Sequence, residues 1–170
     1  LARINRQAYG GQLAAITGSC GKTTTKEMFA AVLSVMGETL ATQGNLNNDI
    51  GAPLTLFRLE PDTEYAVIEL GASGLGEIAW TGSLASPDVG ILTNASEAHL
   101  EGFGSLENIV QAKGELIDSV RLTGTMVLNH DDAAYPIWRE RAGTRRVLSV
   151  SAEGNTEADL RPADVSEDEH

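Results

Sequence analysis

A short glycine-rich segment with a lysine separates an apolar run from a helical pattern near the start of the chain. The apolar run is Leu13–Ile16, the segment continues as TGSCGKT over residues 17–23, and the helical pattern begins at Lys22. Glycines let backbone N–H groups approach phosphate oxygens, and a helix N-terminus adds its positive dipole end. This order predicts a phosphate cradle after a buried strand, with Lys22 reaching the outer phosphates and Thr23 offering its hydroxyl to Mg²⁺.

The segment departs from the strict phosphate-loop pattern at its first position, where Ile16 stands in place of glycine. Gly18 then supplies the first flexible residue. On the motif alone, a helix N-terminus with an incidental lysine remains the alternative to a nucleotide site. Cys20 within the loop is either a reactive thiol beside the helix N-terminus or a small residue that fits there.

Apolar runs alternate with helical patterns along the chain, which predicts an α/β fold with a mostly parallel sheet flanked by helices. Ligands in such folds bind at the carboxyl ends of the strands, where the phosphate loop, Glu69, Asn94 and Asn129 fall. The predicted strands are Leu13–Thr17, Thr39–Thr42, Tyr65–Leu70, Val89–Asn94, Thr125–Asn129 and Arg146–Val150. The predicted helices are Lys22–Met36, Ile50–Leu56, Gly76–Leu84, Ser105–Val120 and Asp131–Arg141.

Composition limits the classes of partner and compartment. With 170 residues the chain has the length of one domain, and its net charge of −12 argues against nucleic acid as the main partner. Its apolar runs are far shorter than the ~20 residues that cross a bilayer, so we expect no membrane insertion. A single cysteine excludes an intrachain disulfide and fits a cytoplasmic location. Half of the net charge lies in Ser151–His170, which we expect to be an exposed or frayed end.

Three further side chains are candidates for chemistry. Glu69 ends an apolar strand beside the phosphate loop. A buried carboxylate at this place predicts a bound Mg²⁺ ion, and the alternative is that the carboxylate caps the next turn. His99 lies on a loop that follows a strand. Its imidazole could be a metal ligand, a neighbour of a phosphate group or a structural hydrogen-bonding group. Lys113 lies near the buried edge of an amphipathic helix, where desolvation lowers a lysine pKa and leaves a reactive neutral amine. The alternative is that its ammonium extends to solvent.

A segment rich in asparagine, Thr42–Gly51, contains three asparagines and two glycines. These residues suit turns, so the segment could be a connector. Its amide donors and acceptors also suit an anionic, sugar-bearing substrate. The residue types alone leave the two interpretations equally open.

Five motifs in order together resemble the central, ATP-binding domain of the Mur ligases. They resemble most the type that joins D-alanyl-D-alanine (D-Ala-D-Ala) to UDP-N-acetylmuramoyl-tripeptide (UDP-MurNAc-tripeptide). The similarity runs from about Leu13 to about Val165. The motifs are AITGSCGKTT (15–24), GNLNNDIG (44–51), VIELGA (67–72), AHLEGFGS (98–105) and AKGE (112–115).

The resemblance implies an amide ligase that uses ATP to convert a carboxylate to an acyl phosphate, which the amine of D-Ala-D-Ala then attacks. It assigns Lys22 to the ATP phosphates, Thr23 and Glu69 to one Mg²⁺, and His99 to a second. It also implies that Lys113 is carbamylated by CO₂. Lys22, His99 and Lys113 are the expected catalytic residues. The residues expected at the nucleotide are Gly18, Ser19, Cys20, Gly21, Lys22, Thr23, Thr24, Asn45 and Asn48.

The resemblance also bears on the extent of the chain. We expect residues 1–170 to be a partial central domain that lacks the N-terminal UDP-binding domain and the C-terminal domain. Alone it would bind nucleotide weakly and would not ligate. Ser73 stands where family members often carry asparagine. Two alternatives remain: a related amide ligase such as a folylpolyglutamate synthase, and a phosphate-loop nucleotide-binding module without ligase chemistry.

Overall fold

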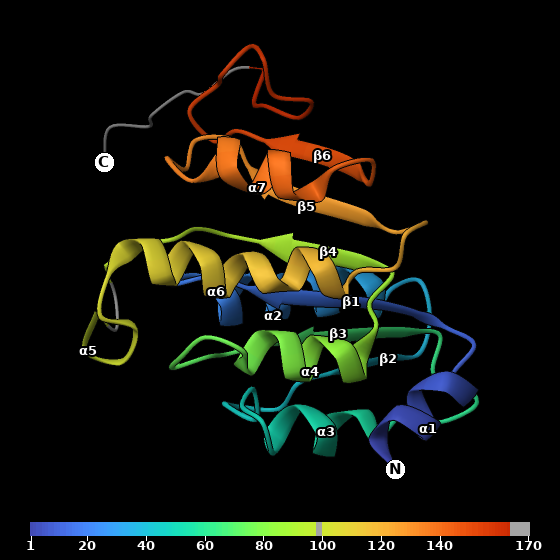
Figure 1. Cartoon of the computed structure of the whole chain (residues 1–170). Helices are drawn as coiled ribbons and strands as arrows, with labels where there is room; N and C mark the ends of the chain where they lie inside the picture. Colours follow the sequence, from blue (N-terminus) through green and yellow to red (C-terminus); the bar gives the residue numbers. More distant parts are fainter. Residues whose placement is uncertain (98–99, 164–170) are drawn as a thin grey trace, which may run out of the picture.

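Six strands form one parallel sheet in the order β2-β3-β1-β4-β5-β6 (Figure 1). The computed structural model describes residues 1–97 and 100–163. The predicted α/β fold with a parallel sheet is confirmed. The strands are β1 (Gln12–Thr17), β2 (Thr39–Ala41), β3 (Tyr65–Glu69), β4 (Val89–Leu92), β5 (Thr125–Asn129) and β6 (Arg146–Val150).

The central strand β1 is apolar on both faces because helices cover both sides of the sheet. Its neighbours are β3 and β4: Ala15 pairs with Ile68 on one side and with Gly90 on the other. Leu13, Ala15 and Ile16 are fully buried. The carboxyl end of β1, where the glycine-rich loop begins, therefore lies between the ends of β3 and β4.

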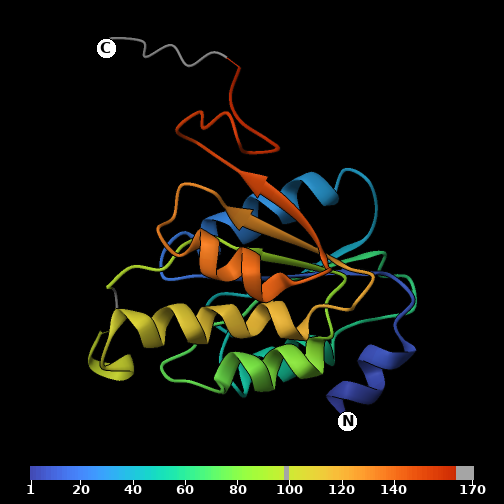
Figure 2. The ribbon, with the colours of Figure 1, turned by 45° about the horizontal axis from the view of Figure 1, so that its top comes forward.

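The helices divide between the two faces of the sheet, as Figure 2 shows. One face is covered by α2, and the opposite face by α4, α6 and α7. The small α1 packs against α3 and α4. The helices are α1 (Ala2–Ala8), α2 (Lys22–Leu33), α3 (Gly51–Leu56), α4 (Glu77–Ala85), α5 (Leu100–Phe103), α6 (Leu106–Ser119) and α7 (Tyr135–Ala142).

Two apolar clusters fill the space on either side of the sheet. On the α2 side, Ile16, Val67 and Ile91 pack with Ala30 and Leu33. The larger cluster on the other side joins strand residues to α4, α6 and α7. It contains the fully buried Trp138, and the indole Nε1 of this residue donates to the Val110 carbonyl at 3.1 Å. This bond satisfies a polar group that burial would otherwise leave without a partner.

Several predicted element boundaries were wrong. The helix predicted to end at Met36 ends at Leu33, and Val35 is 88% exposed in the turn that follows. The fourth strand ends at Leu92 rather than Asn94, because Thr93 and Asn94 turn towards the phosphate loop and bond to it. The helix predicted from Asp131 begins at Tyr135.

Two helices were not predicted. One is α5, a single turn, and the other is α1 near the start of the chain. A buried guanidinium holds α1 in place: Arg6 donates to the Ala85 and Ser86 carbonyls and to the Asp88 carboxylate. This anchoring depends on residues about 80 positions away and has no local signature.

The acidic C-terminal segment is ordered over the part that the structure describes. Most side chains of residues 151–163 are exposed, as expected, but Ser151 and Ala158 are buried. Leu160 forms a parallel bridge with Val150. The expectation of a frayed end is therefore wrong for residues 151–163, because backbone bonds and the Asp131 carboxylate hold this segment. Residues 164–170 lie outside the described part.

Within the described residues, no helix combines the length and apolarity required to cross a membrane.

Candidate functional site

The glycine-rich loop connects the end of β1 to the start of α2. Gly21 takes a positive φ of 77° at the helix N-cap, and Gly18 has a φ of 151°. A Cβ on Gly18 would also collide with the Thr93 hydroxyl. Glycine is therefore required at position 18 both by backbone conformation and by the close approach of the β4 end.

Residues after β4 support the loop from one side. The Ser19 N–H donates to the Asn94 carbonyl at 3.0 Å, and the Cys20 N–H donates to Asn94 Oδ1 at 2.9 Å. Thr93 Oγ1 donates to the Cys20 carbonyl at 2.7 Å, and the Ser19 hydroxyl exchanges bonds with the backbone of Ser96. The Cys20 side chain is exposed, and its sulfur lies 3.8 Å from the Ser96 hydroxyl.

Lys22 bends back over the loop. Its Nζ donates to the carbonyls of Gly18 at 2.7 Å and Ser19 at 3.0 Å. The ammonium thus lies against the backbone of the loop, where it would meet a phosphate as a point charge. Thr24 is exposed in the first turn of α2.

Glu69, the last residue of β3, is 1% exposed, and both of its carboxylate oxygens are hydrogen-bonded. Oε2 accepts from Thr23 Oγ1 at 2.9 Å, and Oε1 accepts from Asn47 Nδ2 at 2.8 Å. The Glu69 N–H donates to Thr42 Oγ1 at 2.9 Å. The structure therefore brings together Thr23 and Glu69, the two residues expected to share a metal.

The Thr23–Glu69 pair fits a magnesium ion bound with a nucleotide. Hydroxyl and carboxylate oxygens are hard ligands, and Mg²⁺ in such sites takes few protein ligands and completes its shell with phosphate and water. In the described part of the chain, no three His, Cys, Asp or Glu side chains gather in a way that could hold a metal. A dedicated protein cage for the metal is thus not formed by these residues. His99 lies outside the described residues.

The asparagine-rich segment divides into different local roles. Asn47 reaches Glu69, whereas Asn48 Oδ1 accepts from the backbone N–H groups of Ile50 and Gly51 at the start of α3. Asn45 is exposed, and its carbonyl accepts from the Asn47 N–H at 2.7 Å. Asn45 and Asn48 were the residues expected at the nucleotide. The residue that reaches the carboxylate is Asn47, which sequence reasoning did not single out.

Lys113 lies in the middle of α6 and is 3% exposed, so its ammonium does not extend to solvent. The pKa of Lys113 is lowered to about 8, chiefly by burial and secondly by the positive charge of Lys22, against the opposing effects of Glu77 and Glu115. Its Nζ lies 5.2 Å from the centroid of the Phe103 ring. A lysine in this setting has a substantial neutral fraction near physiological pH.

A second buried lysine, Lys26, was missed. It lies one turn after Lys22 on α2, is fully buried, and donates to the Thr42 carbonyl at 2.8 Å. Its ammonium also pairs with Glu27 at 2.8 Å. Because the Thr42 hydroxyl accepts the Glu69 N–H, Lys26 supports the end of β3. The spacing of four residues from Lys22 is the only signal that the sequence offers.

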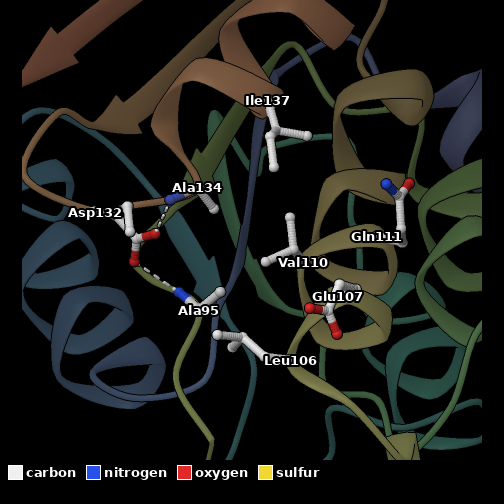
Figure 3. A pocket seen from close by; sticks show the side chains of 9 residues that line it. Ala95, Leu106, Glu107, Val110, Gln111, Asp132, Ala134 and Ile137 are labelled. Carbon is white, nitrogen blue, oxygen red and sulfur yellow. Dashed lines mark hydrogen bonds between the residues drawn. The ribbon is translucent and has the colours of Figure 1, made fainter.

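An apolar pocket of about 250 Å³ lies between α6 and α7. Figure 3 shows Val110 and Ile137 directed into it, and Asp132 at its side accepting from the backbone nitrogens of Ala95 and Ala134. Lys22, Glu69 and Lys113 do not line it. The pocket is therefore separate from the phosphate loop, although Ala95 follows Asn94 directly.

The chain matches the family profile of the Mur ligase middle domain over residues 16–170. It is 50% identical over 151 residues to the UDP-N-acetylmuramoyl-tripeptide–D-alanyl-D-alanine ligase of Escherichia coli strain K12, covering 89% of this chain and 33% of that protein. The chain thus spans about a third of the length of the curated relatives that it matches.

Solved structures agree with these matches. The UDP-N-acetylmuramoylalanyl-D-glutamyl-2,6-diaminopimelate–D-alanyl-D-alanyl ligase from Acinetobacter baumannii has a TM-score of 0.89 and 35% identity, over 98% of this chain and 36% of that one. The MurF ligase from Thermotoga maritima, in complex with ADP, has a TM-score of 0.80 and 36% identity, over 90% of this chain and 35% of that one. A mutant of L. casei FPGS shares the fold alone. It has 15% identity and a TM-score of 0.63, over 89% of this chain and 49% of that one.

Proposed function

The chain belongs to the Mur ligase family, whose middle domain its residues 16–170 match, and on this premise we propose that the protein is an ATP-dependent ligase of peptidoglycan precursor synthesis. Its substrates would be UDP-MurNAc-tripeptide and D-Ala-D-Ala, as in the names of the relatives at 36–50% identity. The likeness to FPGS is more distant and makes a folylpolyglutamate synthase the weaker alternative.

The proposed reaction has two steps. The carboxylate of the tripeptide attacks the γ-phosphorus of ATP, which gives an acyl phosphate and ADP. The amine of D-Ala-D-Ala then attacks the acyl carbon and loses a proton, and phosphate leaves from the tetrahedral intermediate. The phosphate loop and Lys22 would bind and orient the ATP phosphates.

The observation that carries the proposal is the Thr23–Glu69 pair next to Lys22 at the phosphate loop, together with the buried Lys113, which lies close enough to Lys22 for the charge of Lys22 to lower its pKa. Thr23 and Glu69 would hold Mg²⁺, which neutralises charge on the phosphates when bound. We assign His99 to a second metal by family resemblance. A nucleotide-binding module without ligase chemistry would have no use for a buried lysine beside the phosphate loop, and Lys113 therefore favours the ligase.

We also propose that Lys113 is carbamylated. Its neutral amine attacks the carbon of CO₂, a C–N bond forms, and one proton is released to solvent. The product is an anion, so the buried cation becomes a group that could face a metal. The lowered pKa of Lys113 supports this step, because only the neutral amine is nucleophilic.

We propose that these 170 residues act as a partial central domain of a cytoplasmic ligase, with UDP-binding and C-terminal domains supplied outside them. On this view the chain binds nucleotide weakly and does not ligate alone. Ligation of UDP-MurNAc-tripeptide by the chain itself would contradict this part of the proposal.

Isothermal titration of the chain with Mg²⁺-ATP tests the nucleotide site. We expect binding by the wild type and its loss in Lys22→Ala. Arg58→Ala is the matched control, since it removes one positive charge from an exposed position after α3. Circular dichroism confirms that each variant is folded. Equal binding by wild type and Lys22→Ala would show that the loop does not hold the phosphates.

A further inference from the structure

Asn47 contacts the buried carboxylate of Glu69 through the oxygen that Thr23 leaves free. Its Nδ2 donates to Oε1 at 2.8 Å, while Thr23 Oγ1 donates to Oε2 at 2.9 Å. The two oxygens of one carboxylate are therefore fixed by two residues from different segments. Oε2 and the Thr23 hydroxyl remain adjacent at the phosphate loop, and Oε1 is held by the amide.

Asn47 is itself held firmly by the end of β3. Its carbonyl accepts from the Gly71 N–H at 2.8 Å, and its own N–H donates to the Asn45 carbonyl. A Cβ on Gly71 would lie 2.9 Å from both Cγ and Oδ1 of the Asn47 side chain. The absence of a side chain at position 71 thus leaves the space that the Asn47 amide occupies.

An amide suits this position because it orients a carboxylate without neutralising it. A lysine or arginine at the same place would supply a positive charge and compete with a bound cation. The neutral Nδ2 donor fixes the plane of the carboxylate and leaves its full negative charge available. No ion pair to Glu69 occurs among the described residues.

We infer that Asn47 is the positioning residue for the magnesium carboxylate, holding Glu69 so that Oε2 and the Thr23 hydroxyl face the metal of the nucleotide complex together. This inference rests on the proposed function. It assigns to Asn47 a role in metal binding rather than in contact with the nucleotide or the sugar.

The test separates metal binding from nucleotide binding. The affinity of the chain for ADP is measured by titration with Mg²⁺ and again with EDTA, and the ratio of the two affinities gives the effect of the metal. In Asn47→Ala we expect this ratio to fall about tenfold, the size typical of losing a partner behind a metal ligand. The affinity in EDTA should stay within about twofold of wild type, because Asn47 acts only through Glu69.

Two further variants sharpen the result. Gly71→Ala should lower the same ratio, since its methyl group displaces the Asn47 amide without removing it. Gln7→Ala is the control, because it removes an exposed amide side chain on α1, away from the phosphate loop, and should leave the ratio unchanged. Thermal unfolding of each variant identifies any that fails to fold. If Asn47→Ala does not fold, the affinity ratio of Gly71→Ala tests the inference.

The outcomes distinguish the inference from the proposed function. A wild-type ratio in folded Asn47→Ala and Gly71→Ala overturns the inference alone. Equal weakening with Mg²⁺ and with EDTA overturns it too, because it shows a general structural role. A folded wild-type chain that binds ADP without any effect of Mg²⁺ overturns the inference and the proposed role of Thr23 and Glu69 in holding Mg²⁺, and leaves the nucleotide site standing. A folded wild-type chain that binds no ADP overturns the inference and the proposed nucleotide site.

Discussion

Lys113 on α6 lies close enough to Lys22 of the phosphate loop for the charge of Lys22 to lower its pKa. Burial is the larger cause, and together they bring the pKa of Lys113 to about 8 from the usual 10.5. Lys22 and Lys113, which are 91 positions apart in the sequence, thus influence each other's charge. Protonation of this buried amine therefore costs free energy in the folded chain.

Replacing Lys113 by methionine should stabilise the fold at neutral pH. Because its pKa is lower in the folded state, the folded chain binds fewer protons than the unfolded chain between about pH 8 and 10.5. Below pH 8 the wild type carries the full penalty of the buried cation. We expect Lys113→Met to be more stable by on the order of 2 kcal/mol at pH 7, and less so at pH 10. Urea unfolding at both pH values, without bicarbonate, measures this. A gain independent of pH would contradict it.

Carbamylation of Lys113 should be visible directly. In ¹³CO₂-saturated buffer, we expect a carbamate carbon signal in the NMR spectrum of the wild-type chain. At fixed dissolved CO₂ the signal should increase as the pH rises through about 8, since the neutral amine becomes the main form. Lys113→Met should lack the signal and Lys22→Ala should retain it. A signal that persists in Lys113→Met would assign the carbamate to another amine.

Glu115 should stabilise the start of α4. Its Oε1 accepts from the Gly76 N–H at 2.7 Å and its Oε2 from the Ala79 N–H at 2.9 Å, so a carboxylate from α6 caps a neighbouring helix. We expect Glu115→Ala to lower the free energy of unfolding by about 2 kcal/mol, because both bonds are charge-assisted. Chemical denaturation checks this, with the exposed Glu140→Ala as control. Similar values for the two variants would show that the cap contributes nothing.

Asp131 should hold the acidic C-terminal segment against the sheet. Its carboxylate accepts from the Ser151 hydroxyl and from the N–H groups of Ala152 and Glu153, and these bonds lower the pKa of Asp131. In Asp131→Ala we expect faster hydrogen exchange in residues 151–160, measured by mass spectrometry. Exchange elsewhere should be unchanged, and the exposed Asp62→Ala should behave as wild type. Unaltered exchange would show that the bridge at Val150 suffices.

The parallel fold was predictable because its signals are local. The apolar run at Leu13–Ile16, the glycines after it and the regular alternation of strands and helices each need only a few neighbouring residues. The pairing of Thr23 with Glu69 followed from one further rule, that strand ends meet at one edge of a parallel sheet.

The supporting residues were not predictable in the same way. Asn47 and Asn48 are adjacent and chemically identical, yet one reaches Glu69 and the other caps α3. The difference depends on how the segment after β2 crosses the end of β3, which is set by the order of strands. Asn94 was expected only as a residue at a strand end, and its two bonds to Cys20 depend on β4 lying beside β1.

The central position of β1 has a thermodynamic consequence. The phosphate loop receives Glu69 from the half of the sheet that contains β3, and Asn94 from the half that contains β4. A nucleotide bound there stabilises only forms in which both halves are docked on β1, since either one alone leaves the cradle incomplete. Binding therefore links the local unfolding of β2–β3 to that of β4–β6, and ligand should slow the opening of two sets of strands that are paired only through β1.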